Sequence, residues 1–182
     1  MTSRLTPELR ILKTRLPRER WSDLPAGSLA RTWLTMHASL RDGQQWLERL
    51  ALKWQLKQLD LATFRTRFLA DSEAHFNHLH GHHRLEDRHY FPQFRSIEPR
   101  LQAGFDLLQD DHEQLHAALA RLQVQLQALR DADIESQAAR TLADAIAVDI
   151  YHCGKLLRRH LEDEEDLVIP LLGMGSNTDA AA

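Results

Sequence analysis

Residues 101–129, LQAGFDLLQDDHEQLHAALARLQVQLQAL, carry apolar side chains at alternating spacings of three and four residues. The stripe consists of Leu101, Phe105, Leu108, His112, Leu115, Leu119, Leu122, Leu126 and Leu129. This spacing places the whole stripe on one face of an α-helix, which we expect over residues 99–130. One member of the stripe is a histidine, and a histidine among buried leucines needs a hydrogen-bond partner or a metal ion.

Similar stripes predict three more long helices on either side of this one. We expect them over residues 28–57, over residues 60–91, and from the polar stretch 130–135 to about residue 172. The chain contains only seven glycines and six prolines, which leaves few places where β-hairpins turn. Four amphipathic helices with short connections predict an all-α fold, an antiparallel up-down-up-down four-helix bundle. In this arrangement Pro92 and Pro99 mark the exit of the second helix.

The chain of 182 residues is expected to form one domain, the bundle of residues 27–173, with a segment on either side. Residues 1–26 form an N-terminal extension, in which Pro7 predicts the start of a short helix that runs to residue 16. The small and polar residues 174–182 predict a disordered tail. The extension is basic, and we expect it to be a solvated strap over the bundle or, as the less favoured alternative, a docking surface. Its cations are Arg4, Arg10, Lys13, Arg15, Arg18 and Arg20.

Composition argues against several classes of protein. The chain has 23 lysines and arginines against 26 acidic residues, and this balance argues against a nucleic acid or an anionic membrane as partner. The single cysteine, Cys153, excludes an intramolecular disulfide and a zinc site built from cysteines. The first residues lack the apolar stretch of a signal peptide, and no stretch approaches the roughly 18 to 20 apolar residues of a membrane span. We therefore expect a cytoplasmic protein.

Histidine stands out in the composition, because six of the 11 histidines lie within residues 75–89. Two segments, HHRLEDRHYFP at residues 82–92 and HLEDEEDLVIP at residues 160–170, form a degenerate internal repeat. In each segment a glutamate follows the first histidine by four residues, which puts the two side chains on one helix face. The resulting pairs are His82 with Glu86, His160 with Glu164 and, with a second histidine in place of the glutamate, His112 with His116. The first helix adds His37 on its apolar stripe.

Antiparallel helices bring two residues to the same level when both lie equally far from the connecting turn. His37 lies about 21 residues before the turn at residues 58–60, and His82 lies about 22 residues after it. The pairs on the second and third helices also match, whereas the match to His160 is looser. The predicted metal ligands at this level are His37, His82, Glu86, His112, His116, His160 and Glu164. Five imidazoles and two carboxylates suit a pair of first-row transition metals.

The seven predicted ligands divide between two ions. One ion takes His112, His116 and His160, the other takes His37 and His82, and the bridging carboxylates are Glu86 and Glu164. This division leaves one coordination position open on the second ion. His116 has an alternative, because its neighbour Leu115 already completes the apolar stripe and an outward-facing imidazole fits the pattern too.

Several polar neighbours of the predicted ligands allow two interpretations. The acids Asp111, Asp163 and Glu165 are either solvated charges or acceptors that orient a ligand imidazole. The histidines His78, His83 and His89 are either outer hydrogen-bonding groups or part of a solvated histidine-rich face. If His78 or His89 points toward the open metal position, it can donate a proton to bound peroxide.

The order of these motifs resembles the hemerythrin-like (HHE cation-binding) domain family over about residues 30–172. The resemblance rests on His37, on the two segments that end in proline, and on DDHEQLH at residues 110–116 between them. It implies an antiparallel four-helix bundle with two iron ions in a non-haem centre, joined by an oxo or hydroxo bridge. Carried over position by position, it implies the same seven ligands. In true hemerythrins the last carboxylate lies five residues after its histidine, at Glu165, whereas the HHE pattern favours Glu164, the spacing that the first segment repeats.

These features predict a diiron protein whose open iron position binds or reacts with dioxygen, peroxide or nitric oxide. The sequence predicts neither enzymatic turnover nor its absence, and it identifies no protein partner. The alternative is an iron- or zinc-binding sensor or storage module without turnover. A ferritin-like carboxylate oxidase is disfavoured, because Glu113 and His116 supply only one of the two Glu-x-x-His motifs that such a centre needs.

Overall fold

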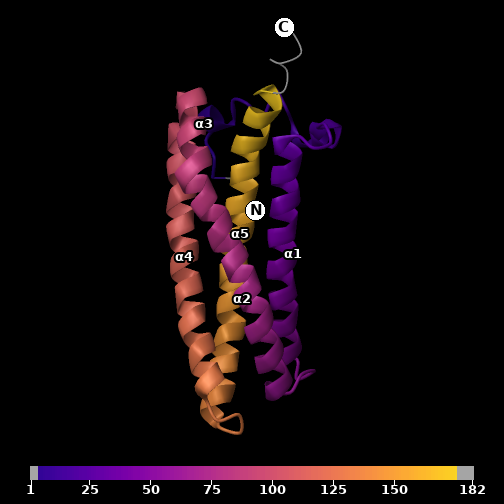
Figure 1. The fold of residues 1–182 in the computed structure, drawn as a ribbon, viewed down its shortest axis with the longest axis vertical. Helices are drawn as coiled ribbons and strands as arrows, with labels where there is room; N and C mark the ends of the chain where they lie inside the picture. The colour runs from indigo at the N-terminus through magenta and orange to yellow at the C-terminus, as the bar shows by residue number, and fades with distance from the viewer. Residues whose placement is uncertain (1–3, 176–182) are drawn as a thin grey trace. The chain divides into compact units, whose positions relative to one another are not determined.

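The computed structural model describes residues 4–175, and every regular element in this range is helical (Figure 1). The five α-helices are α1 (Leu29–Gln55), α2 (Leu61–Leu85), α3 (Phe91–Ile97), α4 (Gln102–Asp131) and α5 (Gln137–Gly175). The other elements are a π-helical turn at Glu86–Tyr90, between α2 and α3, and 3₁₀-helices at Pro7–Arg10, Arg18–Asp23 and Pro99–Leu101. The expectation of an all-α protein is therefore confirmed for the described part of the chain.

The four long helices predicted from the apolar stripes are present, with ends that differ from the prediction by a few residues. The N-terminal extension differs more, because a 3₁₀-helix and further hydrogen-bonded turns take the place of the helix expected over residues 7–16. Helix α5 includes the first two residues of the predicted tail, whereas residues 176–182 and residues 1–3 lie outside the described residues. No helix within residues 4–175 is both long enough and apolar enough to cross a membrane.

The second long helix continues through Pro92, although the sequence analysis expected it to end there. Pro92 has no N–H to donate, and in a regular α-helix its ring would clash with the carbonyl of Arg88. The turn before it is wider, because the N–H of Phe91 donates to the carbonyl of Glu86, five residues back. The wider turn puts Phe91 on the same buried face as Glu86 and leaves His89 exposed.

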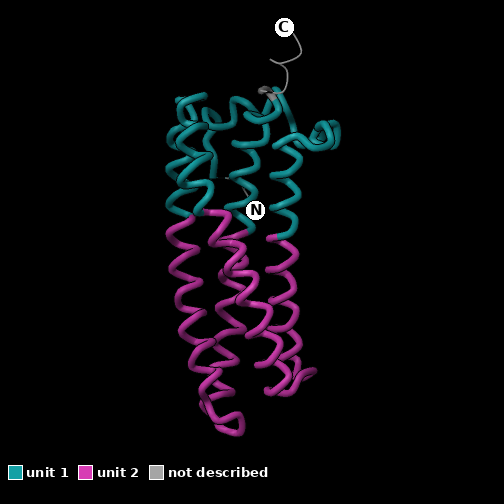
Figure 2. The backbone as a smooth tube through the Cα atoms, in the orientation of Figure 1, with its two compact units in different colours: residues 1–39, 84–111, 158–182 teal, residues 40–83, 112–157 magenta. Residues whose placement is uncertain are grey.

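The contacts of the chain divide it into two compact units, which Figure 2 draws in different colours. Unit 1 comprises residues 1–39, 84–111 and 158–182, and all but residues 1–3 and 176–182 of this unit are described. Unit 2 comprises residues 40–83 and 112–157. Helices α1, α2, α4 and α5 each contribute residues to both units.

Unit 1 has a hydrophobic core in which the N-terminal segment takes part. The core consists of Leu5, Leu9, Leu12, Trp21, Leu24, Ala30, Trp33, Phe91, Phe94, Leu101, Phe105, Leu108, Leu167, Val168, Ile169 and Leu171. Its aromatic contacts include the edge-on pair of Trp33 and Tyr90, with ring centroids 4.9 Å apart. Because five of these core residues come from residues 4–24, that segment is a packed part of unit 1, and the expectation of a solvated strap is wrong for it.

The core of unit 2 consists mainly of leucine, alanine and phenylalanine, and the side chain of Gln44 crosses it. Phe64 and Phe68 pack with ring centroids 5.1 Å apart. Gln44 of α1 donates from Nε2 to the carbonyl oxygen of Ile150 at 2.9 Å, and its Oε1 lies 3.3 Å from Nε2 of His75. The Gln44 amide thus ties α1 to both α2 and α5 within this unit.

The buried His75 makes the stability of the protein depend on pH. Burial, together with the neighbouring His78, lowers the pKa of His75 to about 4. In the unfolded chain the pKa returns to about 6.5, so the unfolded state binds more protons between pH 6.5 and pH 4. The free energy of unfolding therefore falls as the pH drops through this window, and the loss from His75 reaches about 2 kcal/mol at pH 5.

Urea unfolding at pH 7 and at pH 5 measures this loss. We expect His75→Gln to lose about 2 kcal/mol less stability than the wild-type protein between the two pH values. The exposed His152 supplies the control, since His152→Gln should follow the wild-type protein. Equal losses in His75→Gln and in the wild-type protein would contradict the prediction.

Candidate metal centre

Two predicted histidine ligands meet at one buried carboxylate, Glu164, in unit 1. Glu164 and His160 lie one turn apart on α5, and His37 lies on α1. Oε1 of Glu164 is 3.4 Å from Nε2 of His37, and Oε2 of Glu164 is 3.1 Å from Nε2 of His160. All three side chains are 0% exposed. One carboxylate thus faces two imidazoles, one with each oxygen, so it can serve two metal ions at once.

Two more side chains adjoin Glu164. The indole N–H of Trp33 donates to Oε1 of Glu164 at 2.8 Å. Glu86, from the π-helical turn, is 1% exposed. His37, Glu86 and Glu164 each offer one potential ligand atom, and these three atoms lie within 4.8 Å of one another. The π-helical turn therefore brings a second buried carboxylate into the group.

The two carboxylates differ in charge. Burial and the neighbouring charge of Glu164 raise the pKa of Glu86 well above its usual value. Burial would also raise the pKa of Glu164, but His37 and His160 outweigh this effect and hold it well below its usual value. Burial likewise opposes the charging of His37, but Glu164 and Glu165 raise the pKa of its imidazole to about 9. The charge of Glu164 is thus balanced by imidazole protons, the protons that a metal cation displaces when it binds.

The second ring nitrogen of each histidine faces another buried carboxylate. Nδ1 of His37 lies 3.1 Å from Oε1 of Glu165, and Nδ1 of His160 lies 3.7 Å from Oδ2 of Asp111. Glu165 and Asp111 are each 2% exposed, which excludes the interpretation that they are solvated charges. Metal-ligating histidines usually give their other ring N–H to a carboxylate, because this contact fixes the ring and its tautomer. His37 has this contact, whereas Nδ1 of His160 lies beside Asp111 at the longer distance of an ion pair.

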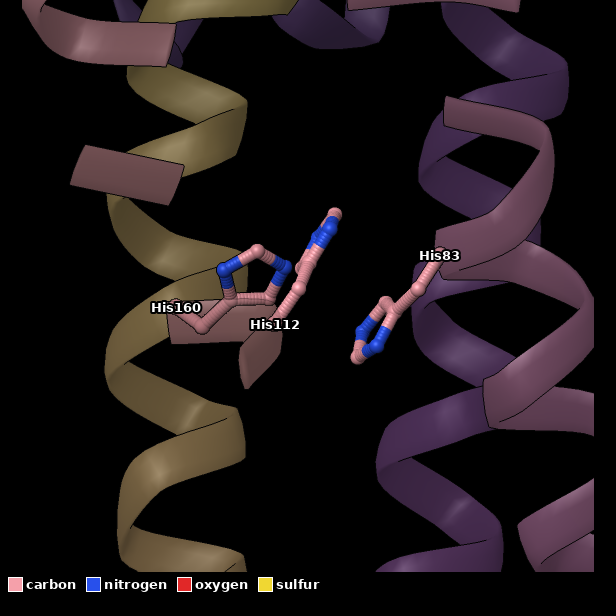
Figure 3. A group of neighbouring side chains, drawn as sticks. All are labelled: His83, His112 and His160. Atoms are coloured by element: carbon pink, nitrogen blue, oxygen red, sulfur yellow. The ribbon is translucent and has the colours of Figure 1, made fainter. Parts of the chain in front are cut away.

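Unit 2 contains a second cluster, which is made of histidines. The rings of His83 and His112, from α2 and α4, stack with centroids 3.9 Å apart (Figure 3). Nδ1 of His83 lies 3.2 Å from Nε2 of His116. His82, His83 and His112 are buried, and His116 is partly exposed. His160, which the same figure shows, projects from α5 and belongs to unit 1 (Figure 3).

His83 is a candidate ligand that the sequence analysis did not assign. Its burial excludes the solvated-face interpretation, whereas His78 and His89 are both exposed. The idea that His78 or His89 points inward as a proton donor is therefore wrong: Leu79 takes the buried position on α2, and the π-helical turn leaves His89 outside. The doublet of His82 and His83 was the available signal, because consecutive helix residues point about 100° apart and both are buried only where the helix is covered on two sides.

These features define a helical cation-binding module, with buried carboxylates and imidazoles in unit 1 and buried imidazoles in unit 2. The chain belongs to the hemerythrin HHE cation-binding domain family, since the family described as "Hemerythrin HHE cation binding domain" matches residues 28–172. The resemblance inferred from the motifs is therefore confirmed. The comparison with curated proteins gave no match, and neither did the comparison with solved structures. The match begins after residues 4–24, so this packed N-terminal segment lies outside the family domain.

The hydrogen bond from Trp33 to Glu164 provides a test of the buried site. Trp33→Phe keeps an aromatic ring but removes the N–H donor of a buried, ionised carboxylate, and we expect the metal-free protein to lose about 1 to 3 kcal/mol of stability. Trp46→Phe is the matched control, because Trp46 donates the same kind of bond to Asp71 at 2.7 Å but is exposed. Chemical unfolding of both variants measures the difference, and equal losses would show that burial does not strengthen the Trp33 bond.

Proposed function

We propose that this protein holds two iron ions in a non-haem diiron centre, whose open position binds or reacts with dioxygen, peroxide or nitric oxide. The observation that carries the proposal is the carboxylate of Glu164, whose two oxygens face the Nε2 atoms of His37 and His160. A donor set rich in imidazole favours iron, zinc or copper over magnesium and calcium. Membership in a cation-binding family supports a metal site within residues 28–172.

The proposed ligands are the seven that the sequence predicts, His37, His82, Glu86, His112, His116, His160 and Glu164. His83 is an eighth candidate and the alternative to His116, because it is fully buried and stacks on His112. In this proposal all of these ligands serve one centre, and the four-residue spacing of His82 and Glu86 puts both on one face of their helix.

The same proposal includes the antiparallel arrangement of four long helices, α1, α2 with α3, α4 and α5, as one bundle. The bundle comprises residues 27–173, with residues 1–26 as its extension, and the expected location of the protein is the cytoplasm. Each helix then contributes at least one ligand, which accounts for a histidine on the buried stripe of every long helix.

The residues of the site have separate tasks in this proposal. Bound iron supplies the electrons and the Lewis acidity that a small ligand needs. The N–H of Trp33 holds Glu164, Glu165 lies at hydrogen-bond distance from Nδ1 of His37, and Asp111 lies 3.7 Å from Nδ1 of His160. A carboxylate beside Nδ1 leaves the electron pair of Nε2 available for a metal. Burial of these donors keeps water away from the charges they carry.

The exposure of His78 and His89 favours a second candidate function. A peroxide-consuming enzyme needs a positioned proton donor, and the two histidines expected in that role lie at the surface. An iron- or zinc-binding sensor or storage module without turnover needs no such donor. The metal content and the absorption spectrum separate this candidate from a diiron centre.

The first prediction from the proposal concerns metal content and its dependence on the carboxylates. Protein purified from iron-supplied cells should contain two irons per chain and show near-ultraviolet bands of a coupled diiron centre. Glu86→Ala and Glu164→Ala should lose these bands, because each removes a bridging ligand, whereas Glu165→Ala should keep them. Zinc without such bands would favour the sensor or storage module, and loss of the bands in Glu165→Ala alone would reverse the assignment on α5.

The second prediction concerns stability. Without a metal the site clusters histidines and carboxylates in the protein interior, and a ligand that binds only the folded state adds stability by mass action. Thermal unfolding should therefore show a higher Tm for the iron-loaded protein than for protein stripped with a chelator. An equal Tm for both forms would contradict a buried, folded-state metal site.

A further inference from the structure

The N-terminal segment places three cations on the buried acids of unit 1. Arg4 donates from Nε to Oδ2 of Asp163 at 2.9 Å and binds Asp111 through both of its terminal nitrogens, with Nη1 to Oδ1 at 2.9 Å. Lys13 donates from Nζ to Oδ2 of Asp166 at 2.7 Å. Arg18 donates from Nε to Oδ1 of Asp166 at 2.7 Å, and its Nη1 lies 3.3 Å from an oxygen of Glu165.

Two of these acids are the ones that face the histidines of the site. Arg18 contacts Oε2 of Glu165, whose Oε1 lies 3.1 Å from Nδ1 of His37. Arg4 contacts Asp111, whose Oδ2 lies 3.7 Å from Nδ1 of His160. The segment therefore reaches His37 and His160 through the same sequence of groups, a guanidinium, a carboxylate and an imidazole.

The geometry of these contacts suits orientation better than simple neutralisation of charge. A guanidinium offers its donors in a planar fork, and two bonds from one fork fix the plane of a carboxylate. Arg4 makes two such bonds to Asp111, whereas Arg18 divides its fork between Glu165 and Asp166. A fixed carboxylate in turn fixes the direction in which an imidazole donates its Nδ1–H, and with it the direction of Nε2. A side chain that merely balanced charge would need no such contact to the acid beside a ligand.

We propose that residues 4–18 are a positioning strap of the metal centre, in which Arg4 acts through Asp111 on His160 and Arg18 acts through Glu165 on His37. The inference rests on the proposed metal centre. It assigns a role to the basic extension, which lies outside the matched family domain. The strap holds both imidazoles with Nε2 directed at Glu164, and metal binding therefore becomes tighter when the strap is docked.

The test compares variants of the strap with matched controls in the full-length protein. Arg4→Gln and Arg18→Gln remove one guanidinium each. Lys13→Gln is a control within the strap, because Lys13 bonds Asp166 rather than Glu165 or Asp111. Asp166 keeps its bond from Arg18 in this variant. Arg100→Gln removes an exposed pair with Glu98, outside the strap.

Zinc binding, measured by competition with a chelating dye, is the first readout. Loss of an outer hydrogen-bond partner typically weakens metal binding about 10- to 100-fold, and we expect this loss in Arg4→Gln and Arg18→Gln but not in the two controls. Arg4→Lys and Arg18→Lys keep the charge without the fork, remain suitable if the glutamine variants fail to fold, and should recover only part of the affinity.

Nuclear magnetic resonance of the zinc-loaded protein, with ¹⁵N-labelled histidine, is the second readout. Arg4→Gln should weaken or shift the Nδ1–H signal of His160 alone, and Arg18→Gln that of His37 alone. A strap with a purely structural role would move both signals together or neither. If the wild-type protein binds zinc, unchanged affinity and unchanged signals in both variants would overturn the strap. A wild-type protein that binds neither zinc nor iron would overturn the metal centre itself.

Discussion

The structure of unit 1 depends on how four consecutive buried acids on α5, residues 163–166, obtain compensating charge. Each of them is at most 4% exposed. Consecutive residues of an α-helix point about 100° apart, so these acids face every side of the helix and no single neighbour can serve them all. Removing a carboxylate from water without a partner costs several kcal/mol, and each acid therefore needs its own cation or donor.

The partners of these acids divide the helix into an inner and an outer side. On the inner side Glu164 faces two imidazoles and an indole N–H. On the outer side Asp163 and Asp166 face the arginines and the lysine of the N-terminal segment. Glu165 lies between the two sides and contacts both an imidazole and a guanidinium. The proposed metal centre and the strap are thus two consequences of one buried acidic stretch.

The sequence predicts the long helices because apolar periodicity is a local property, and each stripe is buried much as its spacing indicates. It does not predict the π-helical turn, because the two repeated segments read alike and only the one ending in Pro92 contains such a turn; α5 remains α-helical around Pro170. That turn determines which side of the helix each residue after Glu86 faces. An inward-facing His89 was therefore one of the possibilities left open by the sequence, and the structure buries Phe91 instead.

The acids that contact Arg4 and Arg18 illustrate a different limit of sequence reasoning. Asp163 and Glu165 follow the usual rule that charged side chains are solvated, and only a partner distant in the sequence reverses that rule. The partners are Arg4 and Arg18, more than 140 residues away, and nothing local links the two stretches. The excess of cations in the N-terminal extension was the available signal for these ion pairs. It did not indicate which acids the cations bind. His83 is similar, since its burial depends on His112, which another helix supplies.

The cations around the buried acids differ in whether they can be exchanged. A guanidinium keeps its proton at any physiological pH, so Arg4 and Arg18 are permanent partners of the acids that they contact. The imidazole of His37 holds its proton because Glu164 and Glu165 favour it, and a metal ion can take the place of that proton. The strap and the metal therefore act on the same histidines from opposite ring nitrogens. Linkage then requires that, if docking of the strap tightens metal binding by some factor, metal binding tightens docking of the strap by the same factor. An extension outside the family domain thereby becomes sensitive to whether the metal site is filled.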